Sequence, residues 1–264
     1  MKKYWLIIKN TWSETLTYRL NFVMWRIRVV VQFLTIYFLW LAVLPPNTNF
    51  GPYDQKLILT YILGAWFVGA IVFSTRTADI GEAINSGDVS NTLIKPVNFF
   101  LYWFSRDLGD KAMNIMFSVV EITLVFLILE PSVFIQTQIT FFALAILSII
   151  LAVIIYFFIS TILGFLGFWT PETWAPRFIL FILVGFIAGE IFPLDILPSG
   201  VMKFLQFSPF TYLIYFPVKV YLGQLSYPQI LGGLTIALAW TILFYLFTKL
   251  VWRFGLRFYA AQGR

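Results

Sequence analysis

Two carboxylates lie inside long apolar runs, where charged side chains are rare. Glu121 lies midway along the run 112–129, and Glu190 lies near the end of the run 178–192. Because a carboxylate in the hydrocarbon core of a bilayer is energetically unfavourable, such residues often transfer protons or contact cationic substrates. The structural alternative is that Glu121 is neutral or hydrogen-bonded to a neighbouring helix, and that Glu190 reaches the outer interface.

The rest of the sequence offers little material for catalysis. It contains no cysteine and no histidine, which removes disulfides, thiolate nucleophiles, imidazole bases and the usual zinc or haem ligands. No GxxxxGK[ST] motif occurs, so the chain has no Walker A loop for ATP. The carboxylates are scattered and not paired. We therefore expect no enzyme activity, no bound cofactor and no metal in this chain.

The longest polar interruption of the apolar sequence is Arg76–Pro96, RTADIGEAINSGDVSNTLIKP. Ile80 and Ile84 are one helical turn apart, which predicts a short amphipathic helix over Ala78–Ser86 that stops at the turn around Gly87. A second helical turn follows. A short helix with one apolar edge at a membrane surface can bind another protein through that edge. The alternative is an ordinary solvated loop.

Composition identifies an integral membrane protein. Hydrophobic residues make up 60% of the 264, charged residues 11%, and the mean hydropathy is +0.87, whereas soluble domains are about a quarter charged. The apolar runs are long and nearly continuous, which favours helices over the alternating strands of a β-barrel. The fold class predicted is an all-α membrane protein that forms a single transmembrane domain over residues 1–264.

Six spans are predicted, together with two flanking segments. The spans are 22–44, 57–74, 112–129, 139–169, 178–192 and 228–252. Residues 1–21 place tryptophans and leucines on one side of a helix and lysines elsewhere, which is typical of a helix in the membrane interface. Residues 95–111 are predicted to be an interfacial approach to the third span. Arg26 and Arg28, near the start of the first span, are expected to reach back to the interface. The segment 193–223 is apolar but broken by prolines, which indicates a re-entrant or interfacial hairpin.

The basic residues predict the orientation in the membrane. With six spans, both termini lie on one side together with the loops after the second and fourth spans. Of the 18 lysines and arginines, all but Lys56, Lys203 and Lys219 fall on that side. The positive-inside rule therefore predicts that both termini and the loop 76–96 are cytoplasmic, in the plasma (inner) membrane. Because the net charge of +6 follows topology, we expect no nucleic-acid partner.

The order of these features, over nearly the whole chain, resembles the permease subunit of type-2 ATP-binding-cassette (ABC) exporters, in the prokaryotic branch whose ATPase is encoded separately. The motifs that carry the resemblance are Asp79-Ile80…Ile84-x-x-Gly87…Leu93-x-x-Pro96, the run EIFPLDILP from Glu190 to Pro198, and SPFTY at Ser208–Tyr212 followed by Pro217 and Gly223.

The resemblance implies a role for each segment. The loop 76–96 would carry the coupling helix that docks in a groove of a cytoplasmic ATPase. Ile80 and Ile84 would be its apolar contacts and Asp79 and Glu82 its rim, with Gly87 and Leu93 completing the contact set. Residues 1–21 would be the connecting helix, and 193–223 the outer hairpin that caps the exit.

The resemblance also implies partners. Two permeases, identical or homologous, would pair around a central path with two ATPase subunits, which would bind ATP and Mg²⁺. Motion of the coupling helix would then reach the first, second and fifth spans. A different function remains open, a proton-coupled secondary transporter that uses Glu121, as does a non-transporting membrane scaffold. No inverted repeat is visible, which counts against the secondary transporter.

Overall fold

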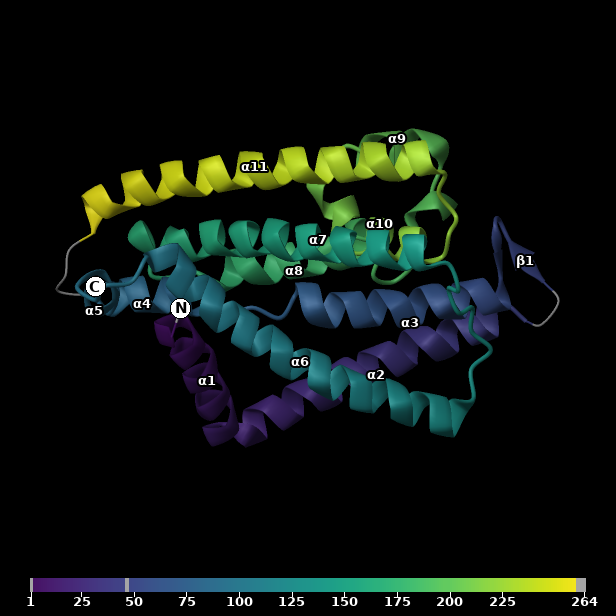
Figure 1. Ribbon diagram of the computed structural model, residues 1–264, viewed down its shortest axis with the longest axis horizontal. Helices are drawn as coiled ribbons and strands as arrows, with labels where there is room; N and C mark the ends of the chain where they lie inside the picture. The colour runs from purple at the N-terminus through teal and green to yellow at the C-terminus, as the bar shows by residue number, and fades with distance from the viewer. Residues whose placement is uncertain (1, 46–47, 260–264) are drawn as a thin grey trace.

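Five long helices run along the length of the molecule in the computed structural model, which describes residues 2–45 and 48–259 (Figure 1). They are α2 (Arg19–Val43), α3 (Gln55–Val72), α6 (Phe99–Leu129), α7 (Ile139–Phe165) and α11 (Tyr227–Phe258). Each is long and apolar enough to cross a membrane. In the described residues the only strands are β1 (Asn49–Phe50) and β2 (Tyr53–Asp54), which pair in a hairpin between α2 and α3. The fold is therefore all-α and multi-pass.

The predicted fifth span differs from the helix that forms there. That helix, α8 (Trp174–Ile187), has 14 residues, which gives a length of about 21 Å against a hydrocarbon core of about 30 Å. Gly189 then adopts a positive φ of 83° and turns the chain, and the Tyr61 hydroxyl donates to its carbonyl oxygen over 2.6 Å. The helix ends below spanning length because the chain is turned and held at this point.

The third predicted span is longer than the apolar run alone suggested. Residues 99–129 form one helix of 31 residues, α6, so most of the predicted interfacial approach belongs to it. Asn98 starts the helix, since its side chain accepts a hydrogen bond from the Leu101 amide over 3.1 Å. The charged residues in the first turns of α6 are compatible with one continuous helix, because their side chains have partners on neighbouring elements.

A separate helix, α1 (Lys2–Thr17), forms within the predicted interfacial segment. It lies at an angle to α2 and packs against the first turns of α6 (Figure 1). The Trp12 indole donates to the Gly109 carbonyl over 2.7 Å, and a side chain at Gly109 would approach the Ile8 backbone to 3.1 Å. Glycine at this position thus allows the two helices to meet closely.

Helix α3 is the centre of the core. Twelve of its 18 residues are buried, with α2, α6, α7 and the short helix α10 (Tyr215–Tyr221) around it. A helix enclosed on all sides should be apolar on all sides, and α3 has no charged residue after Lys56. Close approach of α10 is possible because Gly64 has no side chain, since a Cβ there would lie 3.2 Å from Val218.

The segment 193–223 folds into short helical pieces packed on the long helices. They are η2 (Leu194–Ile196), α9 (Ser199–Leu205), η3 (Pro209–Tyr212) and α10 (Tyr215–Tyr221). Nearly all residues from Thr211 to Val220 are buried, against α7 and α3. Lys219 is buried with them and donates to Asp195 Oδ2 over 2.7 Å and to the Tyr53 hydroxyl over 3.0 Å. The ion pair is internal to the broken segment, and the Tyr53 hydroxyl, which accepts from Lys219 and donates to Asp195 Oδ1 over 2.8 Å, ties that segment to the β1–β2 hairpin.

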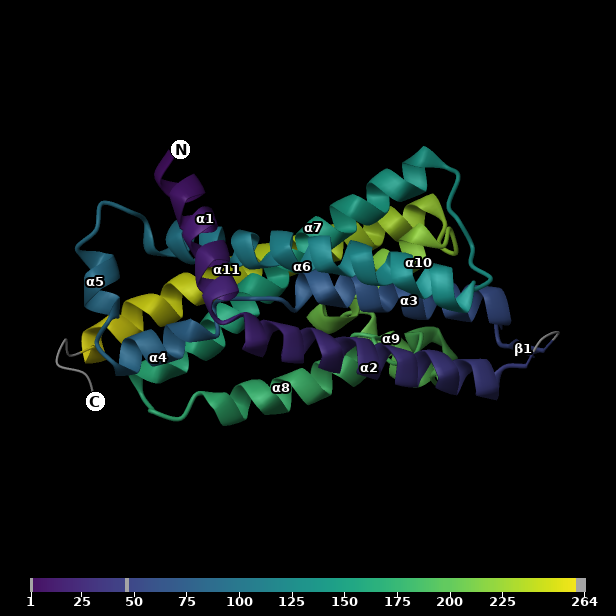
Figure 2. The same cartoon turned by 90° about the horizontal axis from the view of Figure 1, so that it is seen from below.

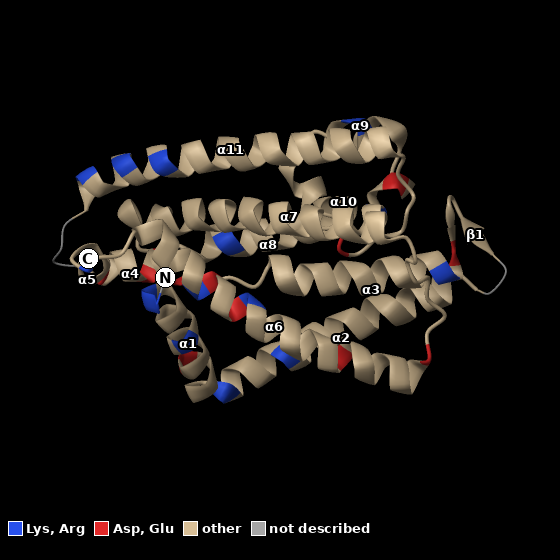
Figure 3. Ribbon diagram, viewed as in Figure 1, with Lys and Arg blue, Asp and Glu red and all other residues tan. Residues whose placement is uncertain are grey.

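Charged residues gather mainly at one end of the molecule (Figure 3). That end carries α1, α4 (Asp79–Asn85), α5 (Val89–Leu93), the start of α6 and the end of α11. It is called the coupling end below. The opposite end carries the β1–β2 hairpin and α9. Such asymmetry along the helix axes is what the positive-inside rule requires of a membrane protein with one cytoplasmic face.

Candidate functional site

The loop between α3 and α6 is folded into two short helices, α4 and α5, as the periodicity of Ile80 and Ile84 predicted. They are separated at Gly87, whose φ is 83°. This left-handed conformation favours glycine. Tyr259, beyond α11, fixes the turn because its hydroxyl donates to the Gly87 carbonyl over 2.6 Å. Gly87 therefore has a conformational role inside this chain.

Ile80 and Ile84 face the interior of this chain. Their exposed fractions are 0% and 4%, and they belong to a second apolar cluster with Phe165, the last residue of α7, and Phe168, three residues beyond it. The predicted contact of these two side chains with an ATPase does not fit this placement, since they are covered by their own protein. The amphipathic pattern predicted the apolar face correctly, but that face packs inward.

The outward face of α4 and α5 carries the other predicted residues. Glu82 is exposed and Asp79 is partly exposed. Leu93 is 45% exposed, and its neighbour Ile94, which sequence reasoning did not select, is 82% exposed. An exposed aliphatic pair at the tip of a short helix is a feature that a protein partner can cover.

Three glycines allow α4 to sit very close to the end of α7 and to η1 (Leu166–Phe168). A Cβ on Gly167 would lie 2.8 Å from the Gly81 carbonyl oxygen. A Cβ on Gly164 would lie 2.8 Å from the Ile80 Cβ, and one on Gly81 would lie 2.6 Å from the Thr173 hydroxyl. No larger residue fits these positions without moving α4. Helix α4 and the end of α7 therefore form one tightly packed unit.

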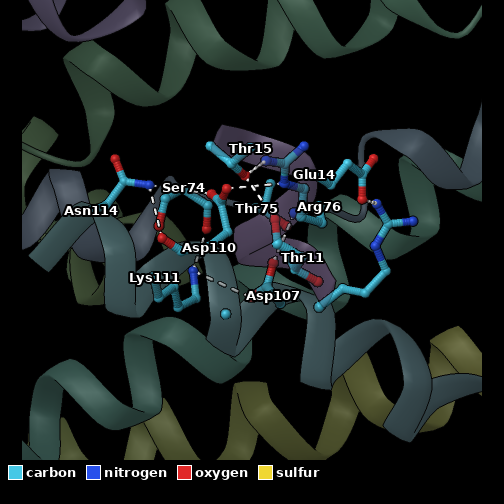
Figure 4. Close-up of polar contacts among 12 residues, drawn as sticks. Thr11, Glu14, Thr15, Ser74, Thr75, Arg76, Asp107, Asp110, Lys111 and Asn114 are labelled. Atoms are coloured by element: carbon cyan, nitrogen blue, oxygen red, sulfur yellow. Dashed lines mark hydrogen bonds and ion pairs between the residues drawn. The ribbon is translucent and has the colours of Figure 1, made fainter. Parts of the chain in front are cut away.

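A polar network joins the start of the loop to α1 and α6 (Figure 4). Arg76 donates to Asp110 Oδ1 over 2.9 Å and to the Thr15 hydroxyl over 2.5 Å. Lys111 pairs with Asp107, 3.3 Å away, and donates to the last carbonyls of α3, including that of Ile71 over 2.9 Å. Asp107 is fully buried and also accepts a hydrogen bond from the Arg76 amide over 3.1 Å. The network fixes where the loop leaves α3.

Arg106 extends the network to α4. It pairs with Glu14 of α1 at 2.7 Å and with Asp79 of α4 at 3.5 Å. Partial burial raises the pKa of the Asp79 carboxyl, and the guanidinium groups of Arg106 and Arg76 oppose that rise. Asp79 is thus held by its own chain and is not a free rim residue.

Arg177 connects α4 to α8. Its guanidinium donates to the Ser160 hydroxyl, to the Ser160 carbonyl and to the Thr77 carbonyl, each over 2.9 Å. Ser160 lies on α7, and Thr77 lies just before α4. The Arg177 side chain therefore bridges α8, α7 and the residues just before α4.

These elements surround a wide cleft of about 1290 Å³ that is open at the coupling end. Its walls are α1, α2, α4, α5, α6 and α8, and it contains charged residues from each side, including Glu14, Arg28, Asp79 and Arg177. Figure 2 shows α8 set apart from α2 on one side of the molecule. A cleft of this size, lined by both charged and aromatic residues, is suited to an amphipathic molecule.

Glu121 is not a free carboxylate. Arg26 Nε donates to Glu121 Oε1 over 2.8 Å, and Arg26 Nη2 contacts Glu121 Oε2. The same guanidinium group donates from Nη1 to Asn114 Oδ1 over 3.0 Å and from Nη2 to the Ser118 hydroxyl over 3.1 Å. The expectation that Arg26 reaches back to the interface is wrong: it is buried and directed into the protein. Glu121 joins α2 to α6, as the structural alternative allowed.

Glu190 lies in a different setting. Its carboxylate lines a small cavity between α2, α3 and α8. Within residues 2–45 and 48–259 it has no hydrogen bond or ion pair. The expectation that it reaches the outer interface does not fit, since a Cβ on Gly69, three residues before the inner end of α3, would lie 3.8 Å from Glu190 Oε1. In the same described ranges, no group of three or more His, Cys, Asp or Glu could hold a metal ion.

Comparison with known proteins identifies the class. The model of the ABC-2 family transporter proteins matches residues 30–263, which is most of the chain. No curated protein matches it at a significant level. The protein is therefore a member of the ABC-2 transporter family, a multi-pass membrane protein of the permease type, whose family members carry no nucleotide-binding domain of their own.

Proposed function

We propose that the protein is the permease subunit of an ABC exporter and is driven by a separate cytoplasmic ATPase. The observation that supports this is the two-sided construction of α4 and α5. One side is locked into the chain by Ile80 and Ile84, and the other presents Glu82, Leu93 and Ile94. A helix that transmits motion from a partner must be fixed to its own chain on one side and accessible to the partner on the other.

In this proposal the ATPase contacts lie on the exposed residues, and the buried pair transmits the motion. Displacement of α4 would reach α7 through the contacts of Gly81 and Gly167, and α8 through Arg177. Both helices adjoin the cleft or the core beside it. A ligand-driven change requires that the ATPase has different affinities for two states of the permease, and ATP binding and hydrolysis would supply that difference.

The proposed assembly contains two permeases, identical or homologous, and two ATPase subunits that bind ATP and Mg²⁺. Helix α8 supports the pairing. It has only two buried residues, Val184 and Gly185, and it borders a cleft that one chain leaves open. A second permease at this side would enclose the path. The termini and α4 would be cytoplasmic and the membrane would be the plasma membrane, as the charge distribution indicates.

A proton-coupled carrier that uses Glu121 is the second candidate. A proton-transferring carboxylate must exchange its proton with water or substrate, whereas both oxygens of Glu121 are engaged by Arg26. The pairing supports a structural role for Glu121 and favours the ATP-driven permease.

Affinity purification of the tagged protein in mild detergent, with identification of co-purifying chains, tests the proposal. We expect a stoichiometric Walker-type ATPase, which is lost in the double variant Leu93→Asp/Ile94→Asp. Phe50→Asp is the matched control, because Phe50 is equally exposed, at 46%, but lies at the opposite end. A wild-type preparation without ATPase, or a Leu93→Asp/Ile94→Asp preparation that keeps it, would contradict the proposal. Any second permease would appear in the same sample.

A further inference from the structure

A cavity of about 60 Å³ lies between α2, α3 and α8 and contains Glu190. It adjoins the large cleft, because Trp25, Arg28 and Phe181 line both spaces. Glu190 lines only the cavity. A molecule that enters from the cleft would therefore pass Arg28 before it reaches Glu190.

The polar groups of this cavity are not satisfied by the protein. In the part of the chain that the structure describes, the Glu190 carboxylate has no hydrogen bond or ion pair. Trp66 lines the same cavity, is only 6% exposed and has an indole N–H without an acceptor there. Because an ammonium group cannot accept a hydrogen bond, the feature of the cavity that favours a cation is the unpartnered carboxylate. Arg26, on the same wall, shows the contrast, since Glu121, Asn114 and Ser118 all accept from it.

Aromatic rings form much of the remaining lining. Phe33 stacks on Trp66 with ring centroids 4.6 Å apart, and Trp25, Phe73 and Phe181 complete the set. Aromatic faces attract cations, most strongly where water is excluded. Arg28 already uses this attraction at the entrance, with its guanidinium 4.1 Å from the Trp25 ring and 5.6 Å from that of Phe181.

We propose that this cavity binds the ammonium head group of an amphipathic organic cation, with Glu190 as its counter-charge and the aromatic rings as its walls. Size agrees with this assignment. One water needs about 10–15 Å³ measured in this way, so the cavity of about 60 Å³ holds roughly four to six such sites, which is enough for the four heavy atoms of a trimethylammonium group. The apolar part of the molecule would extend into the cleft. Arg28, which is exposed on α2 and lines both spaces, is then a competing cation of the protein itself at the entrance.

This inference rests on the proposed function, because it names the substrate class of the permease, but its test is independent of the ATPase. Binding of tritiated benzyltrimethylammonium to the purified full chain in lipid nanodiscs is measured by scintillation proximity. Neopentylbenzene, in which carbon replaces the charged nitrogen, serves as the neutral competitor. We expect saturable binding that the neutral compound does not displace at equal concentration.

Three variants identify the site. Glu190→Gln is expected to weaken the binding at least tenfold, because it removes the counter-charge and keeps the shape. Arg28→Gln is expected to strengthen it several-fold, because it removes the competing cation. Glu130→Gln is the matched control, since Glu130 is an exposed carboxylate in the α6–α7 connection and its loss should change nothing.

Two results would overturn the assignment. One is equal binding of the charged and neutral compounds by the wild type, and the other is unchanged affinity in Glu190→Gln. If Glu190→Gln does not elute as a single species, Arg28→Gln alone decides, and unchanged or weaker binding there overturns the site. Because no ATPase is present, failure here leaves the docking of α4 and α5 untouched, and loss of the ATPase in the earlier purification leaves this site untouched.

Discussion

At the scale of single residues, two acidic side chains that look alike in the sequence have opposite surroundings. Both oxygens of Glu121 are bound by Nε and Nη2 of Arg26, whereas Glu190 faces a cavity. A buried pair is balanced only while both members are present, since a lone charge in a low-dielectric interior has lost its hydration without compensation. The two carboxylates should therefore respond differently to mutation.

Arg26→Met and Glu121→Leu are each expected to lower the free energy of unfolding by about 3–5 kcal/mol, because each leaves one charge buried and unpaired. The double variant should lose much less, since an apolar pair replaces an ionic one. Thermal unfolding of the purified protein in one detergent measures all four members of the cycle. Strictly additive losses would show that the two side chains do not interact. Glu190→Gln, by contrast, should leave the unfolding temperature nearly unchanged.

The sequence identified these carboxylates but not their partners. Arg26 and Glu121 are 95 positions apart, and no local pattern connects them. Asp107 and Lys111 could have been recognised, because a spacing of four residues places both on one helical face. Their pairing was missed because residues 95–111 were read as an interfacial segment and not as part of a helix.

At the scale of elements, the joint between α4 and α7 depends on the absence of side chains. Gly167→Val would place a Cβ 2.8 Å from the Gly81 carbonyl oxygen and force α4 outward. We expect a loss of about 1–3 kcal/mol in stability. The ATPase should still bind, because Leu93 and Ile94 are unchanged, but its stimulation by the permease should fall.

The control for that experiment is Gly232→Val on α11, where nothing lies within 4 Å of the added Cβ. Unfolding temperature and ATP hydrolysis by the reconstituted complex are compared between the two variants. Equal behaviour of Gly167→Val and Gly232→Val in both measurements would show that the joint does not transmit motion.

Helix α8 depends on Arg177 at its inner end. Arg177→Met removes the hydrogen bonds to Ser160 and to the Thr77 carbonyl, while few other contacts hold this helix. We expect faster amide hydrogen exchange in α8 and α4, without an equal change in α3, because local opening requires less free energy where contacts are few. Arg253→Met, at an exposed site on α11, is the comparison. Unchanged exchange in α8 would contradict the bridging role.

The accuracy of the sequence reading differed between elements for physical reasons. Residues 19–43 and 227–258 were largely found because apolar runs longer than a bilayer admit few alternatives. The end of α8 was missed because it depends on Gly189 and on a hydrogen bond from Tyr61, which is distant in sequence. The apolar edge of α4 was found, but periodicity gives a face and not the surface that covers it, so Ile80 and Ile84 were assigned to a partner.

At the scale of the whole molecule, one line of packed elements joins the two ends. Helix α4 packs on α7 at the coupling end, and α7 packs on α10 further along. Lys219 of α10 then reaches Asp195 and Tyr53 beside the β1–β2 hairpin. A rigid displacement of α7 would therefore also move the segment 193–223. Such a connection suits a permease whose two ends must open at different times.

The orientation of the protein in the membrane can be tested directly, because its sequence contains no cysteine. Asn91→Cys, exposed on α5, and Asn49→Cys, exposed on β1, each introduce a single thiol at opposite ends of the molecule. In intact cells a membrane-impermeant maleimide should label Asn49→Cys and not Asn91→Cys, and in inverted vesicles the preference should reverse. Labelling of both thiols from the same side would contradict a spanning arrangement, and the opposite preference would place α4 and α5 outside, beyond the reach of any cytoplasmic ATPase.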